Sequence, residues 1–140
     1  FTYQYFLKPN DVDFGVAHPM NKRLTDSMRQ TSVMPTIFPS HMYVLAPDHL
    51  WYLSLQPNGI GKVRIRYGAA LAPEVIKHAK DKSALVSKFR ELLDKTQEED
   101  RFLVETIFQN IKGPMALPGP LSWLEREVHE FTQYLAREIA

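Results

Sequence analysis

Asp100 is the residue whose place in the sequence most strongly suggests a chemical role. Counted at about 100° per residue along a helix predicted over 83–112, it shares one face with apolar residues, which are Leu93, Val104, Ile107 and Ile111. A carboxylate on an apolar face needs an arginine, several hydrogen-bond donors or a metal ion as its partner. Two interpretations stay open from the helix alone: a structural ion pair or a kink near Thr96, and a metal ligand or acid–base group.

The other reactive side chains form no recognisable constellation. The 5 histidines give no i, i+4 pair on one helix and no H-E-x-x-H motif, so their spacing predicts no metal site. The sequence has no G-x-G-x-x-G or G-x-x-x-x-G-K-[ST] phosphate loop, and its serines and threonines lie in no His/Asp arrangement for nucleophilic catalysis. Lys62, Arg64 and Arg66 predict a solvated edge or a subunit contact.

Length, charge and cysteine content narrow the class of protein. The chain has 140 residues, of which 44% are apolar, which predicts a single folded domain over 1–140. Its net charge of +1 argues against nucleic-acid binding, and no apolar run approaches the roughly 20 residues of a membrane helix. With no cysteine, the chain has no thiolate ligand for zinc or an iron–sulfur cluster. We expect a cytoplasmic protein that binds neither nucleic acid nor membrane, and a piece of a longer polypeptide.

The secondary-structure elements that position these residues are predicted to be strands over 1–71 and helices over 72–140. Strands are predicted over 1–7, 36–45, 49–56 and 62–71, with an irregular connection or short helix over 18–30. In the last strand Val63, Ile65 and Tyr67 alternate with the three cations, which predicts one buried and one wet face. A short helix from 72, the long helix and a final helix capped by Ser122 and Glu125 follow. The predicted class is α+β.

Several motifs in the right order resemble one family. They are Phe38-Pro39-Ser40-His41-Met42, Ala46-Pro47-Asp48-His49-Leu50-Trp51, Gln56-Pro57, Val63-Arg64, the segment 99–105 followed by Gln109, Gly119-Pro120-Leu121-Ser122, and Glu127-Val128-His129-Glu130-Phe131. Together they resemble the C-terminal part of the catalytic domain of the α subunit of Rieske non-haem iron oxygenases, the aromatic-ring-hydroxylating dioxygenases.

The resemblance implies a helix-grip fold, related to START and Bet v1-like proteins, in which an antiparallel sheet packs on a long C-terminal helix; here that fold would be incomplete. It implies that Asp100 is the carboxylate ligand of a mononuclear Fe(II) whose two histidine ligands do not occur in this chain. The Rieske [2Fe–2S] cluster would belong to a missing upstream domain. Candidate walls of the substrate pocket are Phe38, Met42, Tyr43, Trp51, Leu53, Leu103, Val104, Ile107 and Phe108.

The implied function is part of an oxidoreductase that hydroxylates an aromatic or other small organic substrate with O2, as in the catabolism of aromatic hydrocarbons. Electrons would come from a ferredoxin or reductase, and the parent protein would be a homo-oligomer, a trimer by analogy. Because the Rieske and histidine motifs are absent, we expect this chain to be inactive alone. Two other hypotheses stay open: a metal-free helix-grip protein that binds hydrophobic ligands, and an assembly module built on the final helix from Ser122.

Overall fold

The computed structural model describes residues 2–7 and 13–140. Its elements, in chain order, are β1 (Thr2–Leu7), a 3-10 helix (Asp26–Arg29), β2 (Thr31–Ile37), β3 (His41–Leu45), β4 (His49–Pro57), β5 (Val63–Leu71), α1 (Pro73–His78), α2 (Lys82–Asn110), a 3-10 turn (Trp123–Glu125) and α3 (Arg126–Ile139). The predicted α+β class, with an open antiparallel sheet and a long helix, is confirmed. Phe1, at the start of the first predicted strand, lies outside the described residues.

The chain folds as two compact units. The first joins residues 1–78 to 123–140 and carries the sheet with α1 and α3, whereas the second, residues 79–122, carries α2. The prediction of one domain over 1–140 stays a prediction.

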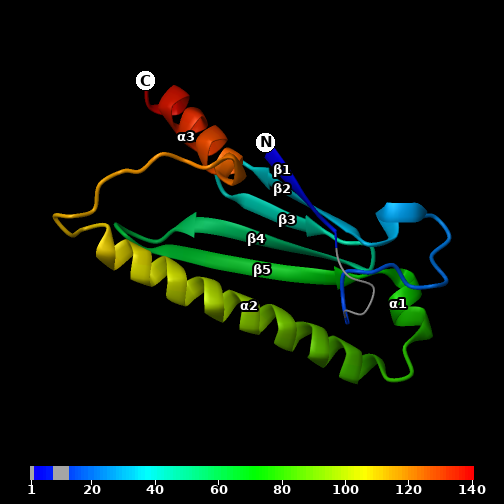
Figure 1. The fold of residues 1–140 in the computed structure, drawn as a ribbon. Coiled ribbons are helices and arrows are strands. Elements are labelled where there is room, and N and C mark those ends of the chain that lie inside the picture. Colours follow the sequence, from blue (N-terminus) through cyan, green and yellow to red (C-terminus); the bar gives the residue numbers. More distant parts are fainter. Residues whose placement is uncertain (1, 8–12) are drawn as a thin grey trace. The chain divides into compact units, whose positions relative to one another are not determined.

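The sheet is a simple antiparallel meander in which each strand pairs with its neighbour in sequence, in the order β1-β2-β3-β4-β5 (Figure 1). The segment 36–45, predicted as one strand, is two, because β2 ends at Ile37 and β3 begins at His41. Pro39 lies in the turn between them, and a proline has no N–H to donate to a strand ladder. β4 and β5 lie within one residue of their predicted bounds.

The cross-strand register gives the sheet two chemically different faces. Trp51 pairs with Val44 and Ala69, and Ser54 pairs with His41 and Arg66. Because alternate residues of a strand point to opposite faces, the apolar face carries Met42, Val44, Trp51, Leu53, Ile65 and Tyr67. The opposite face, which we call the arginine face, carries His41, Tyr43, Tyr52, Ser54, Gln56, Arg64 and Arg66.

The apolar side of β5 is exposed, which corrects the prediction that it is buried. Val63, Ile65 and Tyr67 are 50%, 44% and 41% exposed. β5 is the last strand of the sheet, so in the described part of the chain it has a strand neighbour on one side only. Alternation along a strand tells which residues share a face, and burial additionally requires another layer over that face.

The Asp48 carboxylate joins three segments of the first unit. Its side chain is buried, and both of its oxygens accept the backbone N–H of Gly15 at 2.9 Å. Oδ1 also lies 2.7 Å from Nδ1 of His49, and the Asp48 carbonyl accepts the N–H of Ala72 at 2.7 Å. One residue in the β3–β4 turn thereby ties the loop at Gly15 and the start of α1 to the sheet.

The loop between Gly15 and β2 is organised by a single guanidinium group. Arg29, at the end of the 3-10 helix, donates to the carbonyl oxygens of Ala17, His18, Asn21 and Leu24 at 2.6 to 3.3 Å. These bonds satisfy backbone acceptors of a segment that has no strand partner. The prediction of an irregular connection with a short helix over 18–30 is confirmed.

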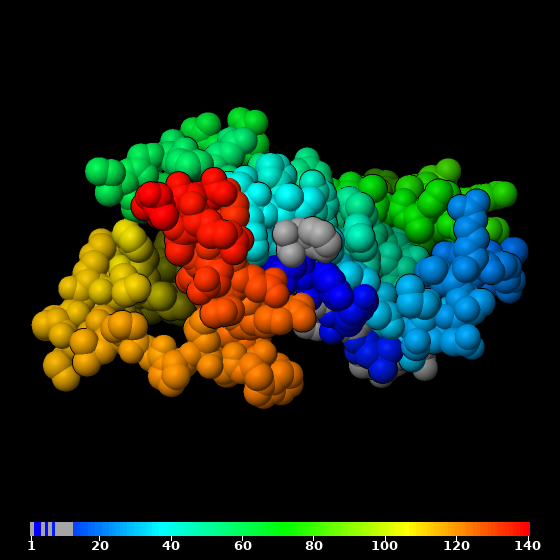
Figure 2. All heavy atoms as spheres, turned by 90° about the horizontal axis from the view of Figure 1, so that it is seen from above, coloured from blue at the N-terminus to red at the C-terminus, as the bar shows by residue number. Residues whose placement is uncertain are grey.

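α3 packs through aromatic contacts against Phe38, which lies in the turn between β2 and β3. The Phe38 ring lies 5.3 Å from Phe131 and 5.4 Å from Tyr134, measured between ring centroids. Arg126 donates to the carbonyl of Tyr3 at 2.7 Å, and Figure 2 shows α3, in red, against the cyan part of the sheet. The helix begins at Arg126 rather than just after Ser122, because the first turn, Trp123–Glu125, is the tighter 3-10 form.

In the second unit, α2 runs unbroken from Lys82 to Asn110, including the position of the suspected kink at Thr96. The Asp81 side chain caps its start by accepting the N–H of Ala84 at 3.0 Å. The helix ends before Gly113, as the sequence predicts. None of the helices in the described part of the chain is both long and apolar enough to cross a membrane.

We expect Gly68→Ala to destabilise the sheet. A Cβ atom at Gly68 would lie 2.8 Å from Cε1 and Oη of Tyr52, its cross-strand partner, so the Tyr52 ring must move. The expected loss is about 1 kcal/mol in the free energy of unfolding, measured in urea. Gly119→Ala is the control, since no atom lies within 4 Å of its added Cβ. Equal unfolding midpoints for the two variants would contradict the close packing of Tyr52 on Gly68.

Asp48→Ala tests the buried carboxylate. The substitution leaves the Gly15 N–H without its acceptor and removes the carboxylate that contacts Nδ1 of His49. We expect a loss of about 3 kcal/mol in the free energy of unfolding. The exposed carboxylate of Glu99 serves as control, and Glu99→Ala is expected to change this free energy by less than about 0.5 kcal/mol. A loss at Asp48 as small as that at Glu99 would count against the tie to Gly15.

Candidate functional site

Asp100 lies on α2 where the apolar stripe of that helix becomes exposed. Phe89 and Leu93, at the start of the stripe, are buried, whereas Val104 and Ile107, beyond Asp100, are 59% and 61% exposed. Asp100 is itself exposed. The unbroken helix places Asp100 on the same face as Leu93, Val104 and Ile107, as the spacing predicts, and this part of the face is exposed in the structure. A helical count gives the direction of a side chain and not what covers it.

The Asp100 carboxylate has no hydrogen bond or ion pair with any residue that the structure describes. Two other acids of the helix are engaged: Arg90 lies 3.5 Å from Asp94, and Arg101 pairs with Glu98. The predicted structural ion pair for Asp100 is therefore absent from residues 2–7 and 13–140. Its oxygens have their lone pairs available for a ligand.

A carboxylate oxygen is a suitable ligand for Fe(II), usually in combination with two imidazoles. Among the described residues, no group of three or more His, Cys, Asp or Glu side chains lies close enough to hold a metal ion. Asp100 thus offers one ligand atom, and the described residues do not complete a mononuclear iron site. The role of Asp100 as a metal ligand stays a prediction.

The histidines of the first unit have other contacts. His18 and His78 stack with ring centroids 5.1 Å apart, and Nδ1 of His41 lies 3.2 Å from the Ser40 hydroxyl. His49 contacts the buried Asp48 and packs edge-on against Phe14. Sequence reasoning missed the Asp48–His49 pair, for which the available signal was an acid and a histidine together in a turn immediately before a strand.

The predicted pocket residues of the sheet are mostly packed against one another. A void of about 10 Å³, room for about one water molecule, is surrounded by Met34, Met42, Tyr43, Val44, Trp51 and Leu53. Four of the five predicted sheet residues thus border this small void: Met42, Trp51 and Leu53 belong to the apolar face, whereas Tyr43 belongs to the arginine face. Phe38, the fifth, lies instead in the aromatic contact with α3.

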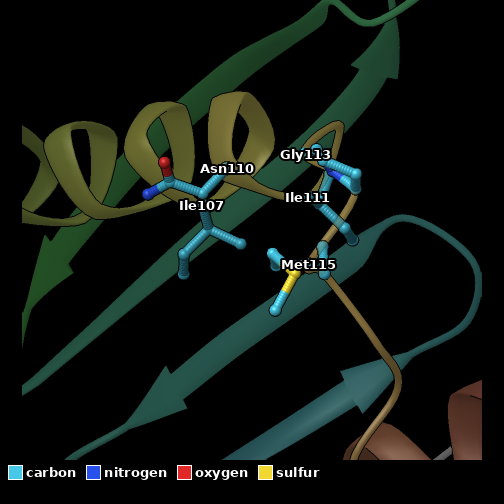
Figure 3. A pocket seen from close by; sticks show the side chains of 7 residues that line it. Ile107, Asn110, Ile111, Gly113 and Met115 are labelled. Atoms are coloured by element: carbon cyan, nitrogen blue, oxygen red, sulfur yellow. The ribbon is translucent and has the colours of Figure 1, made fainter.

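An open hollow lies in the second unit, at the C-terminal end of α2. It measures about 590 Å³ and is lined by Ile107, Asn110, Ile111, Gly113, Pro114, Met115 and Ala116 (Figure 3). Ile107 is the predicted residue that lines it. Leu103 and Val104 are exposed, and the Phe108 ring lies 4.2 Å under the ammonium group of Lys112. The sheet and helix sets belong to different units, and their union in one pocket stays a prediction.

The model of a family described as "Ring hydroxylating alpha subunit (catalytic domain)" matches residues 13–140. No curated protein and no solved structure matches the chain.

Asp100→Ala is expected to leave this chain as stable as before, or more stable by about 0.5 kcal/mol, because alanine is the better helix former and no partner is lost. Leu93→Ala, two turns earlier on the same face, should cost about 2 kcal/mol or more, since Leu93 is only 7% exposed. Urea unfolding of both variants provides the measurement. A large loss at Asp100 would return the structural ion pair to consideration.

Proposed function

This chain belongs to the ring-hydroxylating α-subunit catalytic-domain family, and from that membership we propose that it is the part of an oxygenase catalytic domain that contributes Asp100 as the carboxylate ligand of a mononuclear iron. The enzyme hydroxylates an aromatic or other small organic substrate with O2. The two remaining ligands would be histidines supplied from outside the described residues.

One observation carries this proposal: Asp100 is the carboxylate on the apolar stripe of α2, and no described residue pairs with it. Leu93 and Val104, on either side of Asp100 along this helix face, are apolar, so a surface that covered the face would place the carboxylate in apolar surroundings. A metal ligand fits that position, because a metal site needs a charged oxygen in an environment that excludes water.

Each part of the chain would have a limited task in this reaction. The bound iron supplies the activation of O2. Asp100 would hold a negatively charged oxygen at a fixed place on the helix, and its exposed apolar neighbours Leu103, Val104 and Ile107 would exclude water from it once another apolar surface covers them. Met42, Trp51 and Leu53 would offer the substrate an apolar wall, since they lie on the same face of the sheet.

The family also suggests the partners of this domain. We propose that electrons reach it from a ferredoxin or reductase through a [2Fe–2S] cluster, which must lie outside this chain because the chain has no cysteine. The proposed setting is a cytoplasmic homo-oligomer, with a trimer as the first arrangement to consider.

The first test is the mass and iron content of the polypeptide as its native source makes it. With that polypeptide in hand, Asp100→Ala should remove the mononuclear iron, leave the Rieske spectrum unchanged and lower product formation by about 100-fold or more. Iron analysis and turnover on the same sample measure both effects.

Glu99→Ala is the matched control, because it removes the adjacent exposed carboxylate from a different side of the same turn. It should keep iron and turnover within about twofold of the parent. An Asp100→Ala protein that retained both would overturn the proposal. A native product without iron that nevertheless displaced an apolar fluorescent ligand would favour the metal-free binding protein instead.

A further inference from the structure

A basic row crosses the arginine face at one end of the sheet. Arg66 pairs across the strands with Ser54, which pairs in turn with His41, and Arg64 pairs with Gln56. Since directly paired residues share a face, these side chains lie side by side across three strands. Lys62, two residues before Arg64, extends the positive charge beyond the start of β5.

The charge of this row is not compensated within the described part of the chain. Arg64 and Arg66 are exposed, and neither guanidinium group forms a hydrogen bond or an ion pair with any described residue. None of the five strands contains an aspartate or glutamate. The chain as a whole is nearly neutral, with a net charge of +1, so its acids lie elsewhere and the sheet carries a local excess of positive charge.

The geometry of the row suits carboxylates. Alternate residues of a strand lie about 7 Å apart, so the backbone of β5 holds the two arginines at a regular spacing. A guanidinium binds a carboxylate through two parallel hydrogen bonds, and the Ser54 hydroxyl and Gln56 amide add neutral donors beside the two arginines. Half-buried Ser54 and Gln56 form a shallow floor between exposed cations.

We propose that this row, formed by His41, Ser54, Gln56, Lys62, Arg64 and Arg66, is a docking surface for an acidic protein that presents carboxylates about 7 Å apart. A second copy of this chain is a poor occupant, since the same face would bring arginine against arginine. A nucleic acid is also disfavoured, because three cations are few beside the roughly 6 to 10 phosphate contacts of typical binders. The proposal does not depend on the oxygenase function.

The probe for the test is a fluorescent peptide in which glutamate alternates with serine, so that its extended form repeats acids at the spacing of one strand face. We expect the 140-residue chain to bind it at low salt and release it as salt rises, because screening weakens exposed ion pairs. The Arg64→Gln/Arg66→Gln variant should bind about tenfold more weakly in fluorescence anisotropy. Arg66→Glu is a second variant, which should abolish binding.

Lys80→Gln/Lys95→Gln is the control, since it changes net charge equally at exposed positions outside the sheet, and it should bind the peptide within about twofold of the parent. Unfolding midpoints confirm that each variant is folded. The proposal is overturned if a glutamine peptide binds equally well, if the arginine and lysine variants weaken binding equally, or if a 12-nucleotide oligothymidylate binds more tightly through the same arginines. A dimer in sedimentation that Arg66→Glu dissolves would assign the row to a second copy instead.

Discussion

The register of β4 is the constraint on which both chemically interesting faces depend. β4 pairs along its whole length with β5 and over five residues with β3. A slip of one residue in either pairing would send every side chain to the opposite face. The register that packs Trp51 and Leu53 together on the apolar face is therefore the same one that sets Ser54 beside Arg66. Hydrophobic packing on one side thus determines the spacing of charge on the other.

What the sequence predicted well were features internal to one element. Apolar runs between turn residues identified β4 and β5, alternation identified the two faces of β5, and helical spacing identified α2. The errors arose where the signal was local but the outcome depended on neighbours. Apolar and aromatic residues on both sides of Pro39 concealed the turn there, and the good capping residue Ser122 precedes a 3-10 turn instead of α3.

For the candidate site, too, the sequence predicted features within one element and not those that depend on neighbouring elements. The position of Asp100 among apolar residues follows from helical geometry, and the match over 13–140 confirms the family that the ordered motifs suggested. The exposure of that apolar stripe does not follow from helical geometry, because exposure depends on which surfaces cover the helix. The contact of Asp48 with Gly15 and the row from His41 to Arg66 join residues more than 20 positions apart. Spacing within an element could not have revealed either one.

The discontinuity of the first unit has a consequence for the order in which it forms during synthesis. Tyr3 and Arg126, which are hydrogen-bonded, are 123 residues apart, and the second unit lies between them in the chain. On a ribosome all five strands and the whole of α2 emerge before α3 does. The Tyr3 carbonyl and the Phe38 ring therefore gain their contacts with Arg126, Phe131 and Tyr134 only after α3 has been synthesised.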